Sequence, residues 1–246
     1  MTASAGELHG KAALVTGGSR GIGRAIALGL AAKGASVVVG YRERSQAADE
    51  TVTSIVGGGG RAAAIQADLS SVAEARRLYE RATEAVGALD IVVANAADAL
   101  VKPFMECSED DFDRIFNTNA RGVFFTMQEA ARRLPDGGRI IVTSTGGTRM
   151  FFTETSLYLG SKAAVEQFVR VLSRELGERR ITVNAVSPGF TDTDLLPERD
   201  RAVAADMSPF GRVGDPADVA EVAVFLATDA ARWITGQNVA AGGGVF

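Results

Sequence analysis

Tyr158 and Lys162, in the stretch SLYLGSK, have the residue types and the spacing needed to move a proton. Residues four apart lie on the same face of a helix, so both side chains can point into one cleft. The pKa of a free tyrosine is about 10, and acting near neutrality requires lowering it by about three units, or roughly 4 kcal/mol. A nearby ammonium and a second positive charge can supply stabilisation of that order. Because the only histidine, His9, lies close to the N-terminus, we expect tyrosine to act in place of an imidazole.

Short runs rich in valine and isoleucine alternate along the chain with longer segments of helical period. The predicted strands are 12–16, 36–40, 62–67, 89–94, 139–144, 181–186 and 237–241, and the predicted helices include 22–33, 72–86, 109–133, 157–177 and 217–228. Continuous apolar strands are typical of a parallel sheet that helices cover on both faces. The sequence therefore predicts one α/β domain over residues 1–246, a Rossmann-type doubly wound parallel sheet of about seven strands.

Two glycine- or proline-rich segments lie outside this pattern. The run GGGG at 57–60 follows a helix and precedes a strand, at the edge of the sheet opposite to the one where such folds bind ligands, so we interpret it as a turn. Residues 188–214, called the substrate loop below, form the longest segment without a clear period. A loop of this length in a compact domain is usually a lid or a binding loop.

The first predicted strand runs directly into the stretch GGSRGIG at residues 17–23. Glycines at 17, 21 and 23 allow a tight turn, close approach of a ligand to the backbone, and close packing of helix on strand. The helix that follows offers free N–H groups to a pyrophosphate. This turn predicts a dinucleotide site with contacts from Gly17, Ser19, Arg20, Gly21, Ile22 and Gly23, and an oxidised nicotinamide ring would be the second positive charge near Tyr158.

The residues after the second predicted strand indicate which dinucleotide binds. A site for NAD usually has an acidic residue there, but this chain has Tyr41 followed by Arg42, with Arg20 inside the glycine turn. Arginine can bind a 2′-phosphate with paired, charge-assisted hydrogen bonds. We therefore expect NADP as the cofactor. The alternative is that these arginines are solvated surface charges, because Arg44 shows that the segment is generally basic.

Composition limits the other classes of partner. The formal net charge is −4 and the charges are interspersed, so no basic stripe suggests nucleic acid as a partner. Cys107 is the only cysteine and no second histidine exists, so we expect neither a disulfide nor a metal site. The chain has no signal-peptide pattern and no long apolar segment, so we expect a cytoplasmic protein with no membrane association.

From KAALVTGGSRGIG to ITGQNVAAGGG the chain resembles the classical short-chain dehydrogenase/reductase family over nearly its whole length. The matching motifs are T-G-x-x-x-G-x-G at 16–23, DLS at 68–70, ANAA at 94–97, NTNARG at 117–122, YLGSK at 158–162 and NAVSPGFTDTD at 184–194. The resemblance implies an NADPH-dependent oxidoreductase that exchanges a hydride with a ketone or a secondary alcohol. Because Asn119, Tyr158 and Lys162 are all present, a non-enzymatic nucleotide sensor on the same fold is the less favoured reading.

The resemblance also implies roles for individual residues. Tyr158 matches the general acid/base, Lys162 matches the lysine that lowers its pKa and binds the ribose, and Asn119 matches the residue that holds a proton-relay water. The other implied cofactor contacts are Asp68, Leu69, Asn95 and Ala96 on the adenosine side, and Pro188, Gly189, Thr191 and Thr193 around the nicotinamide amide and the phosphates. Structural roles are open for three of these residues: a helix cap for Asp68, a helix hydrogen bond for Asn119 and a loop position for Thr193.

The chain departs from the family pattern at two places. The family's N-N-A-G is Ala94 to Ala97 here, which changes the support around the fourth strand, and Gly242 stands where an aspartate is usual. The subgroup it most resembles is the 3-oxoacyl-carrier-protein reductases and related polyketide or carbonyl reductases. In those carrier-protein reductases a basic residue commonly precedes the fifth strand, but the nearest match here is Asp136. A reductase or dehydrogenase for free ketones or sugars, including bulky aromatic ketones, is therefore the alternative, with RMFF at 149–152 as a pocket wall or as core.

The family also orients the substrate carbonyl with a hydroxyl group, and two residues compete for that role. Counting back thirteen residues from Tyr158 gives Thr145, whereas Ser144 has the residue type usual in the family. Neighbouring side chains on a strand point to opposite faces, so one of the two hydroxyls is structural. We favour Thr145 on register.

The family commonly forms a homotetramer through its two long helices, which here are 109–133 and 157–177. Apolar residues such as Phe124, Phe125, Phe168 and Val169 serve either that interface or the core.

Overall fold

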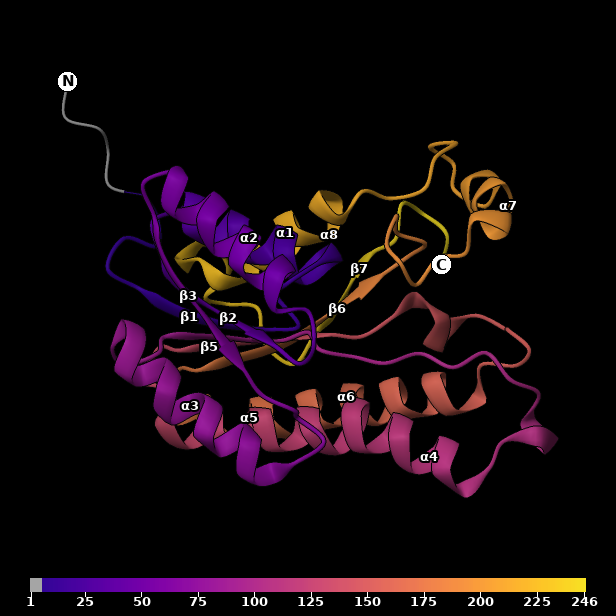
Figure 1. Ribbon diagram of the computed structural model, residues 1–246, viewed down its shortest axis with the longest axis horizontal. Coiled ribbons are helices and arrows are strands. Elements are labelled where there is room, and N and C mark those ends of the chain that lie inside the picture. The colour runs from indigo at the N-terminus through magenta and orange to yellow at the C-terminus, as the bar shows by residue number, and fades with distance from the viewer. Residues whose placement is uncertain (1–5) are drawn as a thin grey trace.

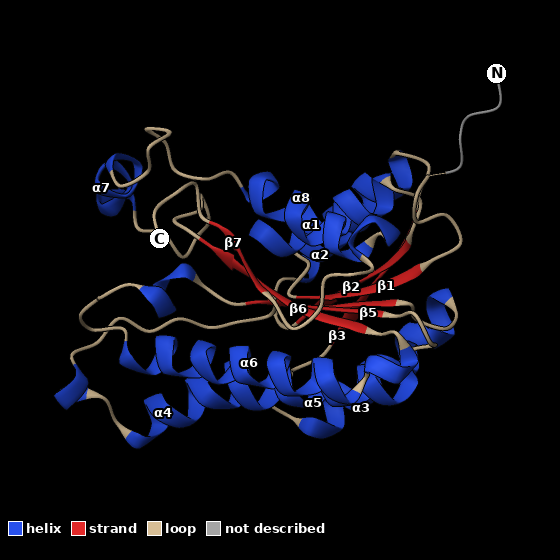
Figure 2. Cartoon of the chain, turned by 180° about the vertical axis from the view of Figure 1, so that it is seen from behind, coloured by secondary structure: helices blue, strands red, loops and turns tan. Residues whose placement is uncertain are grey.

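A seven-stranded, fully parallel sheet forms the centre of the protein, in a computed structural model that describes residues 6–246. The strand order is β3-β2-β1-β4-β5-β6-β7 (Figures 1 and 2). The strands are β1 (Ala12–Thr16), β2 (Ser36–Tyr41), β3 (Arg61–Gln66), β4 (Ile91–Ala94), β5 (Arg139–Thr143), β6 (Thr182–Pro188) and β7 (Asn238–Ala241). The predicted α/β doubly wound fold is confirmed.

Helices cover both faces of the sheet (Figure 1). One layer contains α1 (Gly21–Ala32), α2 (Ser45–Gly57) and α8 (Pro216–Ala227), and the other contains α3 (Val72–Val86), α4 (Glu109–Phe116), α5 (Val123–Arg133) and α6 (Ser156–Glu175). A short helix, α7 (Arg201–Asp206), lies apart from both layers, beside the C-terminal end of the chain. No helix within residues 6–246 combines the length and the apolar character needed to cross a bilayer.

The core is divided by the sheet into two apolar clusters. Along β1, Val15 packs with Ile26 and Leu30 under the first helical layer, whereas Leu14 packs with Leu78 against the second. All of these side chains are buried. Because successive side chains of a strand point to opposite faces, a strand covered on both sides must be apolar at every position. This explains the continuous apolar runs in the sequence.

Three elements differ from the sequence-based expectations. The helix expected over 109–133 has the predicted extent, but its middle, Asn117–Gly122, is π-helical and lies between α4 and α5. A Cβ on Gly122 would lie 2.6 Å from the carbonyl oxygen of Leu69, so the helix approaches that loop closely here. Helix α2 was predicted only as the helix that precedes the GGGG run, without bounds. Only Ala48, Thr51 and Ile55 of its thirteen residues are buried, which leaves a weak apolar pattern. The substrate loop is not wholly irregular either, since it contains α7.

The order of the strands reverses at β1: β2 and β3 follow on one side of it, and β4 is its neighbour on the other side. In doubly wound sheets, ligands bind in the crevice outside the carboxyl ends of the strands at this point. The glycine turn after β1 and the residues after β4 both lie there.

Candidate active site

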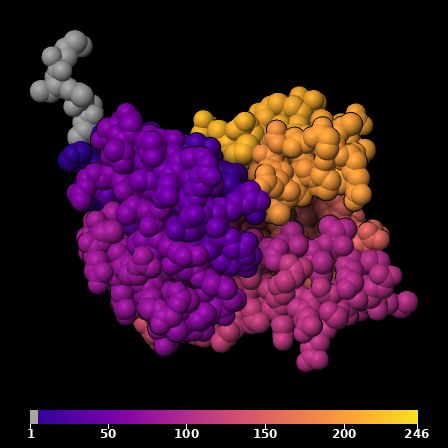
Figure 3. All heavy atoms as spheres, viewed as in Figure 1, coloured from indigo at the N-terminus to yellow at the C-terminus, as the bar shows by residue number. Residues whose placement is uncertain are grey.

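A cleft of about 1260 Å³ opens at the carboxyl ends of the strands. In Figure 3 a hollow lies between atoms coloured orange, near residue 200, and atoms coloured magenta, near residue 100. Small-ligand pockets usually occupy about 300–1,000 Å³, so this cleft has room for a cofactor together with a substrate. Every predicted cofactor contact lines it, as do Ser144, Thr145, Tyr158 and Lys162. Asn119 is fully buried and is not among the residues that line the cleft.

Helix α6 carries both Tyr158 and Lys162 on the face that meets the end of β5. The Lys162 side chain is buried, and its Nζ donates a hydrogen bond to the carbonyl oxygen of Thr143 at 2.7 Å. Burial lowers the pKa of Lys162 to about 8, because removing water disfavours the charged amine. The lysine is therefore still mostly protonated at neutral pH.

Tyr158 lies half-buried four residues before that lysine. Burial raises the pKa of Tyr158, while the hydroxyl of Thr145 beside it acts in the opposite direction. The protein's own groups thus keep the phenol protonated at neutral pH. The net shift of this pKa is therefore opposite to the lowering that the sequence led us to expect. A protonated phenol is the form that can donate a proton to a substrate oxygen.

The two candidate hydroxyls after β5 point in different directions, as the strand geometry predicts. Thr145 is half-buried, lines the cleft beside Tyr158, and its Oγ1 accepts a hydrogen bond from the Gly147 N–H at 3.2 Å. The Ser144 hydroxyl is buried and donates to Oε1 of Glu166 at 2.8 Å. This geometry favours Thr145 as the residue that faces the substrate and gives Ser144 a structural partner.

Asn119 lies in the π-helical segment and ties together three parts of the site. Its Oδ1 accepts from the Asp98 N–H at 2.8 Å, and its Nδ2 donates to the Asp98 carbonyl at 2.7 Å and to the Ser161 hydroxyl at 3.1 Å. An amide oxygen can accept a second hydrogen bond, which is what a water-relay role requires. π-Helical turns inside α-helices occur frequently at functional sites.

The glycine turn has the shape that a pyrophosphate needs. Gly17 and Gly21 have positive φ angles of 64° and 51°. A Cβ on Gly23 would lie 2.2 Å from the Gly17 carbonyl oxygen, so only glycine allows the start of α1 to pack this closely on the turn. The N-cap residue, Arg20, makes no side-chain hydrogen bond to the first turn of α1, which leaves its N–H groups for an anion. The residues present therefore fit a dinucleotide.

The arginines near this turn meet a carboxylate of the substrate loop. Arg20 pairs with Asp194, and Arg44 pairs with the same carboxylate oxygen at 2.9 Å. Arg42 pairs with its neighbour Glu43 at 2.9 Å. Arg20 and Arg44 therefore converge on one anion, although Arg44 was interpreted from the sequence only as a sign of a basic segment. The convergence of residues this distant in sequence has no local sequence signal.

Asn95 supports the ends of three strands in spite of the change from the family's N-N-A-G. Its Oδ1 accepts from the Thr143 hydroxyl at 3.1 Å, and its Nδ2 donates to the Thr16 carbonyl at 3.1 Å. The expected alternative for Asp68, a helix cap, is not seen: Ser71 caps α3, and Asp68 accepts from the Ser70 N–H at 3.0 Å.

Gly242, where the family usually has an aspartate, makes room for an aromatic ring. A Cβ on Gly242 would lie 2.3 Å from the ring of Phe246, and a Cβ on Gly146 would lie 2.0 Å from the same ring. The Arg149 guanidinium lies 5.8 Å from the centre of that ring. The absence of a side chain at Gly242 therefore leaves space for the Phe246 ring, which packs against the turn that follows Thr145.

The outer part of the cleft is apolar and partly aromatic. Phe152 and Phe190 meet edge to face with 6.0 Å between ring centres. Further lining residues of this part are Leu100, Val101, Met150, Leu196, Val203 and Met207. Of the RMFF stretch, Met150 and Phe152 form wall, Arg149 packs on Phe246, and Phe151 is fully exposed. None of the four belongs to the core.

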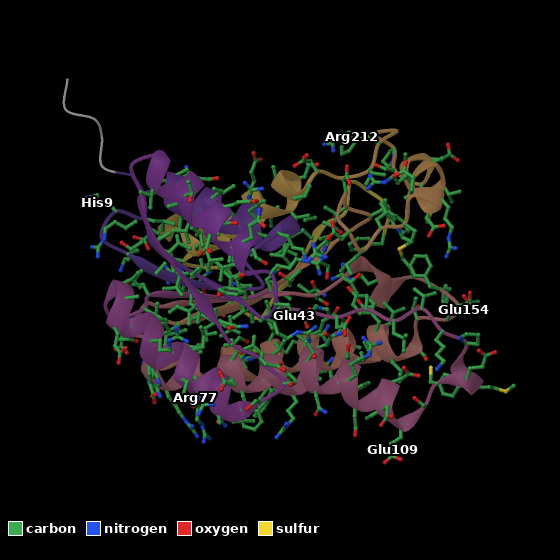
Figure 4. All side chains as sticks on the ribbon, viewed as in Figure 1. His9, Glu43, Arg77, Glu109, Glu154 and Arg212 are labelled. Atoms are coloured by element: carbon green, nitrogen blue, oxygen red, sulfur yellow. The ribbon has the colours of Figure 1, made fainter. Side chains whose placement is uncertain are left out.

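His9 lies far from this cleft, as its sequence position suggested. Figure 4 shows it at the opposite end of the molecule from Glu154, which lines the cleft. Three residues of the site were missed by sequence reasoning: Glu166, Asp194 and Arg44. Only Glu166 had an available signal, since it lies four residues after Lys162 on the same helical face.

Comparisons with known proteins match nearly the whole chain. Residues 17–246 match the family model described as Enoyl-(Acyl carrier protein) reductase. The chain is 43% identical to Hydroxynaphthalene reductase-like protein Arp2 of Metarhizium brunneum, covering 96% of this chain and 95% of that protein. It is 42% identical to Versicolorin reductase stcU of Emericella nidulans, covering 97% of each.

Solved structures of ketoreductases are similar to this chain over nearly its whole length. The structure of the angucycline C-6 ketoreductase LanV with bound NADP has a TM-score of 0.92 and 44% identity, covering 98% of this chain and 97% of LanV. A second structure of LanV contains NADP and rabelomycin, with a TM-score of 0.91 and coverage of 98% of each chain.

Proposed function

The chain belongs to the short-chain dehydrogenase/reductase family and is an NADP-dependent enzyme, and we propose that it reduces a ketone on a fused-ring aromatic molecule to a secondary alcohol. The observation that carries this proposal is the position of Tyr158 and Thr145 together at the base of a cleft whose outer wall is aromatic. The names of the relatives, a hydroxynaphthalene reductase-like protein and an angucycline ketoreductase, support the same substrate class.

NADPH supplies a hydride to the carbonyl carbon when it is bound. In this proposal the glycine turn and the N-terminus of α1 hold its pyrophosphate, and Arg20, Arg42 and Arg44 hold its 2′-phosphate. Lys162 holds the nicotinamide ribose, while Pro188, Gly189, Thr191 and Thr193 line the nicotinamide side of the cleft.

Tyr158 donates its phenolic proton to the carbonyl oxygen as the negative charge develops there. Thr145 donates a hydrogen bond to the same oxygen, so that two donors converge on the developing oxyanion. Lys162 lies on the same helical face as Tyr158, and its ammonium donates to the Thr143 carbonyl at the end of β5. The positive charge stabilises the phenolate left on Tyr158. Asn119 holds the water through which the proton on Tyr158 is replaced.

The alternative substrate is a 3-oxoacyl thioester on a carrier protein. The description of the family model supports a carrier protein as partner, although it names an enoyl group in place of a 3-oxoacyl group. Two observations weigh against it. Asp136 stands where those reductases commonly have a basic residue, and it pairs with Arg179 at 3.2 Å. The Phe152 and Phe190 rings present flat surfaces that suit stacking or edge contacts with fused rings rather than a linear acyl chain.

The proposal is tested by measuring NADPH oxidation with a hydroxylated bicyclic aromatic ketone, an acetoacetyl thioester, a simple cyclic ketone and a quinone. We expect kcat/KM for the bicyclic ketone to exceed that for the thioester by at least about tenfold, or about 1.4 kcal/mol. A faster reaction with the thioester would instead establish the carrier-protein alternative.

We predict that NADPH is preferred to NADH by at least about tenfold in kcat/KM, which corresponds to about 1.4 kcal/mol. The physical reason is the cluster of Arg20, Arg42 and Arg44 and the absence of an acid at Tyr41. Arg42→Ala and Arg44→Ala should each reduce the preference by raising KM for NADPH and leaving KM for NADH unchanged. Steady-state kinetics with both cofactors measure this effect.

Arg77→Ala is the matched control, because Arg77 is an exposed arginine on α3 that pairs with Glu74, away from the cleft (Figure 4). It should change neither KM. Equal efficiency of the wild type with both cofactors would contradict the assignment of the arginines.

We also propose that the chain forms a homotetramer through α4, α5 and α6. Phe112, Phe124 and Val171 on these helices are 46%, 41% and 57% exposed, and the Phe124 ring packs edge to face on Phe168. Val169, which was one of the candidate contacts, is buried and belongs to the core. Light scattering at micromolar concentration should give about four times the 25.6 kDa chain mass, and a monomer would contradict the proposal.

A further inference from the structure

Glu166 is a buried carboxylate on the same face of α6 as Tyr158 and Lys162, with a spacing of four residues between each. Glu166 is 9% exposed and is not among the residues that line the cleft. Among residues 6–246, it makes no ion pair with a lysine or arginine. Burying a charge without a cation is unfavourable unless strong hydrogen bonds compensate. The hydrogen bonds that Glu166 accepts therefore indicate its role.

The Glu166 carboxylate holds two hydroxyls that lie on either side of Thr145 in the sequence. Its Oε1 accepts from the Ser144 hydroxyl at 2.8 Å and from the Thr148 hydroxyl at 2.7 Å. Hydrogen bonds to an ionised carboxylate are among the stronger ones in proteins. One oxygen atom therefore joins the residue before Thr145 to the third residue after it.

The turn between these two hydroxyls is rich in glycine. It begins at Thr145 and continues through Gly146 and Gly147, and glycine adopts more backbone conformations than any other residue. The Thr148 hydroxyl also lies 3.0 Å from the Thr145 carbonyl, but a hydroxyl has a single proton and can donate to only one acceptor at a time. The carboxylate of Glu166 thus adds a side-chain constraint to the packing of Phe246 against Gly146.

We propose that Glu166 is a positioning residue: through Ser144 and Thr148 it holds the Thr145 hydroxyl beside Tyr158. This inference rests on the proposed function, in which Thr145 and Tyr158 act on one carbonyl oxygen. A single rigid helix then carries the proton donor, the lysine and the carboxylate that sets the position of the second donor. Displacing a reacting group by about 1 Å can cost about 10²-fold in rate, so such a device has a measurable effect.

The test is a double-mutant cycle between Glu166 and Thr145, measured as kcat for the bicyclic ketone at saturating NADPH. We expect Glu166→Ala to lower kcat by about tenfold in the wild-type chain and by less than about twofold in a Thr145→Ala chain. The reason is that a displaced turn affects the reaction only while the Thr145 hydroxyl is present. The Kd of NADPH, from fluorescence titration, should stay within about twofold, because the arginines and the glycine turn are untouched.

Two further variants keep the test valid if Glu166→Ala does not fold. Glu166→Gln keeps an accepting oxygen and should retain most of the rate, whereas Thr148→Val removes one of the two hydroxyls and should lose part of it only when Thr145 is present. Ser173→Ala is the matched control, since Ser173 is a buried hydroxyl on α6 that donates to the Arg170 carbonyl away from the turn. It should leave kcat unchanged in both chains.

Equal losses of kcat in the wild-type and the Thr145→Ala chains would show that Glu166 only supports the fold, and would overturn the proposal while leaving the proposed function intact. A wild-type chain that binds NADPH but reduces none of the ketones would overturn the proposed function, and the assignment of Glu166 with it.

Discussion

Replacing Tyr158 with phenylalanine is expected to lower kcat for ketone reduction by about 10³-fold, within the range of about 10² to 10⁴ that a general acid contributes. The substitution removes the phenolic proton that α6 presents to the cleft and leaves the ring in place. Burial raises the pKa of Tyr158, so the wild-type phenol keeps this proton at neutral pH. Single-turnover measurements with pre-bound NADPH separate the chemical step from cofactor binding, which should change little.

Tyr79→Phe provides the control for this result. Tyr79 is a buried tyrosine whose hydroxyl donates to the Thr126 carbonyl at 2.6 Å, in the core beneath α5 and outside the cleft. Its loss should reduce stability slightly and leave kcat unchanged. If Tyr158→Phe kept more than about a tenth of the wild-type rate, the proton would have to come from another group, and the assignment of the general acid would be wrong.

The strands of the sheet were predictable because burial on both faces requires an apolar residue at nearly every position. Val15 and Leu14 serve opposite faces of one strand and both are buried, so the whole strand is apolar and its boundaries can be read directly. The strand predicted over 139–144 ends at Thr143 in the structure, a difference of one residue. Parallel strands covered on both faces give this signal wherever they occur.

The π-helical turn inside the predicted helix 109–133 could not be predicted from its apolar pattern. The pattern continues through the π-helical segment because Ala120 and Val123 are buried like residues of an ordinary helix. What changes is that Asn119 points inward to the Asp98 backbone and to Ser161, which are distant in sequence. Tertiary hydrogen bonds of this kind have no periodic sequence signal.

The positions of the site residues were predictable to the extent that they follow strand ends and helix faces. Tyr158 and Lys162 share a face by spacing alone, and the glycine turn follows β1 directly. The pairing of Arg20 with Asp194 depends instead on where the substrate loop folds back, and the packing of Phe246 on Gly146 depends on the path of the last residues. Both are long-range contacts, which a single sequence does not specify.

The choice between Thr145 and Ser144 yields the second large effect. Thr145→Ala is expected to lower kcat/KM by about 10²-fold or more, because losing one donor to a developing oxyanion costs about 10² to 10³ in rate. Ser144→Ala should cost much less, since the Ser144 hydroxyl donates to the buried Glu166 carboxylate and acts on the reaction only through the position of the turn. Steady-state kinetics with the bicyclic ketone compare the two variants directly.

The conservative variant Thr145→Ser distinguishes the hydroxyl from the methyl group of threonine. Serine keeps the donor and should retain most of the rate, whereas Thr145→Val keeps the shape of the side chain and should fall to the level of Thr145→Ala. Thr148→Val removes another hydroxyl of the same turn and should lose less of the rate than Thr145→Val, because its oxygen contacts Glu166 and the Thr145 carbonyl instead of the cleft beside Tyr158. If Ser144→Ala proved the more damaging change, the turn would have to present Ser144 to the substrate during the reaction. Glu166 would then be left without one of its two hydroxyl partners in the reacting state, so the same result would also contradict its role in holding the turn.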